Sequence, residues 1–242
     1  MRGLFYNLGR KVGPKVRKAK WIWQSMTGSE ADAIKMENEV GRDLAREIRK
    51  QLELDDEQKT VQILNEIGPH LSTCVANRLR SFIFEVVKSD EPNAFALPGG
   101  FVFVTRSLVE LCNWDRDELA FILGHEMAHV VRGHAMRRII SNSAINVASH
   151  AVPIRGQISG WLRTVGTQFF ESAYSQELES QADKLGVLLA DAAGYNPNAS
   201  MQLLRRLNKL DISESQFDIG NYFSSHPPFE VRISNINQLL HR

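Results

Sequence analysis

Apolar residues in the first third of the chain recur at helical spacing and alternate with charged residues. Such a pattern is typical of amphipathic helices with one face toward a core. Ser29 and Asp32 form an N-cap signal at the start of the first charged stretch. The helices predicted here cover residues 29–54 and 56–67, and a short third helix reaches about Arg78 after a break at Gly68-Pro69.

Short apolar runs rich in Phe, Ile and Val follow these helices. Such runs, bounded by turn residues, predict β-strands. They cover residues 81–88, 93–97 and 101–105. Pro98-Gly99-Gly100 separates the last two runs, which predicts a hairpin or tight reversal.

The second half of the chain returns to helical spacing. Asp115 and Glu118 fit the N-cap and third position of a helix, which we predict from Arg116 to about Ile140. Residues 141–168 are rich in Ser, Gly and Asn and predict a loop. Further helices are predicted over residues 169–193, which end before Gly194 and Pro197, over residues 198–210, and from Pro227-Pro228 to the end.

Composition narrows the class of protein. Of the 242 residues, 43% are hydrophobic and 24% charged, which is ordinary globular usage. Two cysteines are too few for a disulfide framework. A net charge of +1 gives the whole chain no general attraction to nucleic acid, so we expect no nucleic-acid partner.

Neither a membrane span nor a signal peptide is expected. The longest segment without Asp, Glu, Lys or Arg is Ile139–Ile154, shorter than the ~20 apolar residues that a span needs. Residues 1–20 carry no apolar run of signal-peptide type. We therefore expect a soluble or peripherally membrane-associated protein.

Residues 1–28 form a basic arm. They contain seven basic residues, no acidic residue, and Trp21 and Trp23. Basic residues beside Trp are typical of surfaces that contact lipid headgroups, and a solvated arm is the other interpretation. We predict a single domain over residues 29–242, with a helical part at 29–80 and a catalytic core at 81–242.

His125-Glu126-Met127-Ala128-His129 carries the chemistry. Two His four residues apart lie about 40° apart around a helix, so both imidazoles reach one zinc ion. Glu126 lies about 100° from His125, where its carboxylate takes a proton from water rather than binding the metal. His134 lies about 180° from His125 on a continuous helix, so we expect a surface or second-layer His rather than a ligand.

A third protein ligand is needed, and the nearest acids indicate where it lies. No Asp or Glu occurs between Met127 and Phe170. Glu179 and Asp183 share a face of the helix predicted over residues 169–193, as do the small residues Ala182 and Gly186. Small residues allow close approach to another helix. We therefore predict Glu179 as the third ligand, and Asp183 as an acceptor that orients a ligand His. Glu171 and Glu177 also lie on this helix, and Glu177 faces the opposite side.

The spacing of these motifs resembles a known family. His125-Glu126-Met127-Ala128-His129, followed fifty residues later by the E-S-Q-A-D-K-L-G stretch that opens at Glu179, is similar to the gluzincins of peptidase family M48. The family includes the CAAX prenyl protease, HtpX, and the Oma-type and BepA proteases. Asn93–Gly100 resembles its edge strand beside the active-site helix. Ser225-His226-Pro227-Pro228, with Arg232, resembles its C-terminal H-P element.

The resemblance covers residues 82–240 and implies a fold and an activity. The implied fold is α+β, mainly helical and zincin-like, with a small sheet whose edge strand lies beside the HExxH helix. The implied activity is that of a zinc metalloendopeptidase with one Zn²⁺ ion, which acts on unfolded or extended polypeptides in protein quality control. Because no membrane span is expected, the chain resembles the soluble or peripheral members of this family. A non-catalytic binding module and a zinc hydrolase of small substrates are the alternatives.

Several site residues rest on the resemblance and keep alternatives. His226 and Arg232 are candidate donors to the oxyanion. Alternatively, His226 caps the last helix or binds the zinc itself, and Arg232 pairs with an acid. The residues predicted to bind substrate backbone by strand addition are Asn93, Ala94, Phe95, Ala96 and Leu97, for which an ordinary hairpin strand is the alternative.

Overall fold

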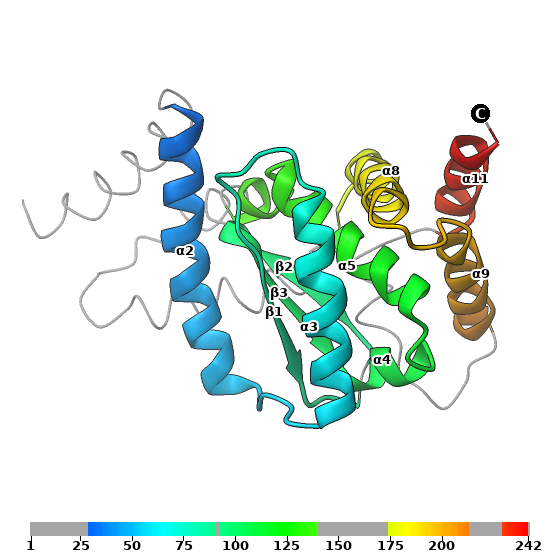
Figure 1. The fold of residues 1–242 in the computed structure, drawn as a ribbon, viewed down its shortest axis with the longest axis horizontal. Coiled ribbons are helices and arrows are strands. Elements are labelled where there is room, and N and C mark those ends of the chain that lie inside the picture. The colour runs from blue at the N-terminus through cyan, green and yellow to red at the C-terminus, as the bar shows by residue number, and fades with distance from the viewer. Residues whose placement is uncertain (1–28, 91, 140–173, 213–228, 242) are drawn as a thin grey trace, which may run out of the picture.

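The computed structural model describes residues 29–90, 92–139, 174–212 and 229–241. Figure 1 shows helix α2 on one side of a small sheet and the C-terminal helices on the other. None of the helices in these ranges is long and apolar enough to cross a membrane. The basic arm, the loop predicted over residues 141–168 and the Ser225–Pro228 element lie outside the described residues.

Three short strands form the sheet. They are β1 (Ile83–Val87), β2 (Ala94–Leu97) and β3 (Phe101–Thr105), in the order β1-β3-β2. β2 and β3 are antiparallel with Leu97 opposite Phe101, and β1 runs parallel to β3. The connection is a 3₁₀ turn, η1 (Pro98–Gly100), in which Gly99 has φ +75°. The predicted hairpin is therefore confirmed.

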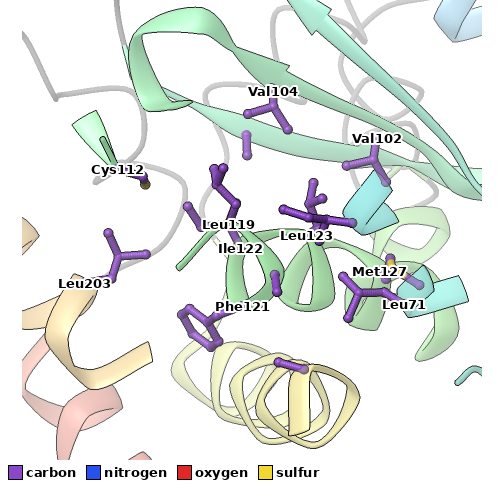
Figure 2. Close-up of a cluster of buried hydrophobic side chains, with 14 of the residues drawn as sticks. Leu71, Val102, Val104, Cys112, Leu119, Phe121, Ile122, Leu123, Met127 and Leu203 are labelled. Carbon is purple, nitrogen blue, oxygen red and sulfur yellow. The ribbon is translucent and has the colours of Figure 1, made fainter. Parts of the chain in front are cut away.

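Helices cover both faces of this sheet, which explains why every residue of β2 and β3 is buried. Val102 and Val104 face α5 (Arg116–Val131), and Figure 2 shows them pointing toward Leu119, Ile122 and Leu123. α3 (Gln58–Thr73) joins the same core. Residues of β2 and β3 that point the other way, including Phe103, pack against α2 (Glu30–Gln51). The mainly helical α+β class with a small sheet is confirmed.

Local signals set the starts of two long helices. Ser29 accepts a hydrogen bond from the Asp32 backbone N–H, and the Asp32 side chain accepts one from the Ser29 backbone N–H, so α2 begins with a capping box. Asp115 caps α5 by accepting from the N–H groups of Asp117 and Glu118. Both predicted N-caps are confirmed.

The predicted break at Gly68-Pro69 is wrong, because α3 runs through both residues to Thr73. Tertiary packing overrides the local signal here. A Cβ at Gly68 would lie 2.3 Å from the Phe84 ring, so the glycine lets α3 lie directly on β1. Leu71, in the last turn, is completely buried.

The helix predicted from Arg116 to Ile140 is also interrupted. α5 ends at Val131, and residues 134–139 are helical again after a turn. Gly133 has φ +69° in that turn, the left-handed conformation that commonly ends helices at glycine. A short helix, α4 (Arg106–Leu111), lies between β3 and α5 and was not predicted.

Three helices follow in the C-terminal part. They are α8 (Gln176–Ala192), α9 (Ala199–Ile212) and α11 (Phe229–Leu240). α8 begins later than predicted, at the Ser175 cap, and its end agrees with the prediction because Gly194 has φ +79°. α8 packs along α5, and α11 packs on α8 and α9.

Candidate metal centre

Helix α5 lies in the interior, and its polar side chains are buried with its apolar ones. Every residue from Glu118 to Val130 is buried. His125, Glu126 and His129 are 1%, 2% and 0% exposed. Burial of polar and ionisable groups costs free energy unless they are paired or bind a metal. The buried side chains of His125, Glu126 and His129 therefore need charged partners, hydrogen bonds or a metal ion.

The predicted ligand atoms lie together in the structure. Nε2 of His125 and Nε2 of His129 are 3.1 Å apart. Glu179 contributes Oε1 at 3.3 Å from His129 Nε2 and Oε2 at 3.6 Å from His125 Nε2. A tetrahedral ion with bonds of about 2.0–2.1 Å separates its ligand atoms by about 3.3–3.4 Å. Two imidazoles and a carboxylate at this spacing therefore fit a catalytic zinc ion.

A glycine–glycine crossing allows α8 to bring Glu179 this close to α5. A Cβ at Gly186 would lie 2.8 Å from the His125 backbone nitrogen, and one at Gly124 would lie 2.9 Å from the Gly186 carbonyl oxygen. Ala182, one turn earlier on α8, is also completely buried. The close approach expected from the small residues of α8 is present. Gly124 was not predicted as the partner, although it directly precedes His125.

Asp183 lies behind the ligand His125. Its Oδ1 is 2.9 Å from Nδ1 of His125, so the imidazole donates through Nδ1 and its Nε2 faces Glu179. Arg232 of α11 clamps the same carboxylate through Nε at 2.9 Å and Nη2 at 2.7 Å. Burial alone would raise the pKa of Asp183, but the Arg232 charge, with the hydrogen bond from His125, lowers that pKa to about 2. Asp183 is therefore ionised and accepts a hydrogen bond from His125, and its role in orienting that imidazole stays a prediction.

Arg232 pairs with an acid, which is one of the two roles that the sequence left open for it. It is 2% exposed and pairs with Asp183, and its Nη1 lies 3.4 Å from Oε2 of Glu179. The guanidinium therefore contacts two carboxylates of the centre. Its role as an oxyanion donor stays a prediction. His226, the other predicted donor, lies outside the described residues.

His129 has neighbours that the sequence did not reveal. The Tyr174 ring stacks on its imidazole with centroids 3.9 Å apart, and Nδ1 of His134 lies 3.1 Å from Nδ1 of His129. Burial raises the pKa of Tyr174 to about 12 and lowers that of His134 to about 4, so both are neutral. The helical-wheel argument that pointed His134 away from the site does not apply, because α5 ends before it. No sequence signal identified Tyr174.

The predicted substrate strand forms an edge of the described sheet and packs against α5. Residues Ala94–Leu97 are all buried, so their side chains belong to the two cores. Asn93 precedes the strand, and its backbone N–H donates to Oγ1 of Thr105 at 2.8 Å. Strand addition uses backbone groups, and it stays a prediction.

Comparisons with known proteins agree with this geometry. The profile of Peptidase family M48 matches residues 58–240. The mitochondrial metalloendopeptidase OMA1 of Schizosaccharomyces pombe is 34% identical over 160 residues, which cover 64% of this chain and 45% of that protein. The human metalloendopeptidase OMA1 is 29% identical over 171 residues, or 66% of this chain and 32% of that protein. The β-barrel assembly-enhancing protease of Escherichia coli is 24% identical over 214 residues, or 84% of this chain and 43% of that protein. The chain thus spans less than half the length of each of these relatives.

Proposed function

Since the chain belongs to peptidase family M48, we propose that it is a zinc-dependent metalloendopeptidase that hydrolyses peptide bonds in protein substrates. The observation that carries this proposal is the buried cluster of His125, His129 and Glu179, in which the two Nε2 atoms are 3.1 Å apart and each lies 3.3–3.6 Å from an oxygen of the Glu179 carboxylate. Glu126, which a hydrolytic mechanism requires, is buried on the same helix between the two His ligands. A non-catalytic binding module would not require this carboxylate.

Each residue of the centre has a distinct task in this proposal. His125, His129 and Glu179 hold one zinc ion, which supplies an activated water and polarises the scissile carbonyl. Glu126 accepts a proton from the attacking water and passes it to the leaving amine. Asp183 and Arg232 fix the orientation of the ligands. His226 and Arg232 are the candidates for the groups that stabilise the oxyanion.

The substrates that we propose are unfolded or extended polypeptides. An edge strand beside the active-site helix binds such chains through backbone hydrogen bonds and selects little for sequence. Residues Asn93–Leu97 supply that edge. The relatives are named as OMA1 metalloendopeptidases and as a β-barrel assembly-enhancing protease. On this basis we propose a role in quality control of misfolded or membrane-associated proteins.

Residues 1–28 are proposed to attach the enzyme peripherally to anionic membranes. Seven basic residues and two Trp support this role. The remaining residues, 29–242, are proposed to form one catalytic domain. The part at 29–80 includes α2, which covers the face of the sheet opposite α5.

Digestion of casein by the zinc-loaded full chain tests the proposed activity. We expect cleavage that a chelator abolishes and added zinc restores. The Glu126→Gln variant should keep the fold and the zinc but lose nearly all cleavage, because the amide cannot accept the proton. Glu110→Gln, at an exposed position on α4, is the matched control and should cleave like the wild type. Full activity of Glu126→Gln would show that Glu126 is not the general base. Absence of cleavage by the zinc-loaded wild type would show that the chain is not a peptidase.

A further inference from the structure

The ligand His129 heads a chain of hydrogen bonds that is separate from the Asp183–Arg232 pair. After the 3.1 Å contact between the two Nδ1 atoms, Nε2 of His134 lies 3.3 Å from Oε1 of Gln181. Nε2 of Gln181 then donates to Oε1 of Glu177 at 3.3 Å. His134 is completely buried, Gln181 is partly buried and Glu177 is exposed. The chain thus connects the metal centre with the surface of α8.

The exposed end sets the direction of every hydrogen bond in this chain. The carboxylate of Glu177 only accepts, so the amide nitrogen of Gln181 faces it and the carbonyl oxygen faces His134. That oxygen also only accepts, so His134 carries its proton on Nε2. A neutral imidazole has one N–H, and Nδ1 of His134 is therefore an acceptor. The donor to it is the Nδ1–H of His129, which leaves a lone pair on His129 Nε2.

We propose that His134 and Gln181 are positioning residues, which hold His129 in the tautomer whose Nε2 lone pair faces the metal. The inference rests on the metal centre proposed above. Both ligand imidazoles are then oriented from behind, His125 by the carboxylate of Asp183 and His129 by His134. Because His134 is itself an imidazole with two tautomers, it needs Gln181 to fix its own proton.

The interruption after α5 makes this arrangement possible. On a continuous helix, a residue five positions on lies about 140° away around the axis, and His134 would not reach His129. The turn at Gly133 redirects the chain, and His134 returns to the metal centre. Tyr174 stacks on His129 with an angle of 17° between the rings, which fixes the ring plane, while the hydrogen bond fixes rotation within that plane. Together the two contacts leave His129 a single orientation.

The direction of these hydrogen bonds is tested with two substitutions at Gln181, which is partly buried near the surface of α8. Gln181→Glu keeps an acceptor toward His134, whereas Gln181→Lys offers only donors and reverses the chain. Zinc affinity of the full chain is measured by competition with a chromogenic chelator. We expect Gln181→Glu to bind zinc within about 3-fold of the wild type and Gln181→Lys to bind about 10–100-fold more weakly. Gln176→Lys, at an exposed Gln of the same helix, is the matched control and should bind like the wild type.

A spectroscopic readout separates orientation from packing. In the zinc-loaded wild type and in Gln181→Glu, NMR of ¹⁵N-labelled histidine should show His134 protonated on Nε2, and in Gln181→Lys it should show protonation on Nδ1. Equal zinc affinities of Gln181→Glu and Gln181→Lys, or a proton on Nδ1 of His134 in the wild type, would overturn the inference alone. A wild type that binds no zinc would overturn the proposed function as well.

Discussion

The crossing of α5 and α8 offers a sharp test of how the fold builds the site, through the variant Gly186→Ala. An alanine Cβ there would lie 2.8 Å from the His125 nitrogen and 3.0 Å from its Cα. These are backbone atoms of a buried helix, so no side chain can rotate away. Ordinary contact begins at 3.4 Å, and α8 must therefore move by about 0.6 Å or more. A metal site tolerates changes of only about 0.2 Å in its ligand distances.

Two effects on stability oppose each other in this variant. Overpacking of a tight contact costs about 1–3 kcal/mol. Alanine in a helix interior is favoured over glycine by about 1 kcal/mol. We therefore expect a net loss of about 0–2 kcal/mol, equivalent to a fall in Tm of up to about 8 °C at roughly 2–4 °C per kcal/mol. Zinc affinity should fall more clearly, by at least about 10-fold, because Glu179 moves with α8.

The assay is zinc competition with a chelator, together with thermal melts with and without zinc. Gly68→Ala is the matched control, because it also adds a methyl group to a crowded helical glycine, against the Phe84 ring and away from the ligands. Gly68→Ala should lower Tm but keep the zinc affinity of its folded form. If Gly186→Ala binds zinc like the wild type, the close crossing of α5 and α8 is not what positions Glu179.

Three further predictions concern the acids of α8 and the arm. Glu179→Ala should lose most zinc in metal analysis, because it removes a ligand, and exposed Glu177→Ala should keep most of it, because it removes only the outermost acceptor beyond Gln181; the reverse result would overturn the ligand assignment. Asp183→Asn should retain zinc at saturating metal, while its rate of peptide cleavage falls about 10–100-fold. Because it also leaves buried Arg232 without its main partner, chemical denaturation should show a loss of about 3–5 kcal/mol, and unchanged stability would contradict the pairing. Deletion of residues 1–28 should leave cleavage of a short peptide intact and weaken sedimentation with anionic liposomes; unchanged sedimentation would exclude the membrane role.

Features encoded by neighbouring residues were predictable from the sequence. The caps at Ser29 and Asp115 and the turn at Pro98–Gly100 depend on local hydrogen bonds and backbone conformation. The grouping of Glu179 with Asp183 followed from helical spacing, and the structure places both carboxylates at the two His of α5. These predictions needed no knowledge of distant contacts.

Features decided by distant contacts were not predictable. α3 continues through Gly68-Pro69 because β1 and the buried Leu71 stabilise its last turn. Gly133 fits an α5 that ends at Val131, but the long helical pattern around it concealed that end. Consequently the sequence left His134 between a surface and a second-layer position, and the structure shows the second-layer position against His129.

The proposed function depends on one zinc ion that His125, His129 and Glu179 hold together. Anomalous diffraction at the zinc absorption edge, from crystals of the zinc-loaded full chain, tests it most directly. We expect one anomalous peak at about 2.0–2.2 Å from the two Nε2 atoms and from a Glu179 carboxylate oxygen. A zinc peak elsewhere in the chain, or one at the two His without Glu179, would show that this ligand assignment is wrong.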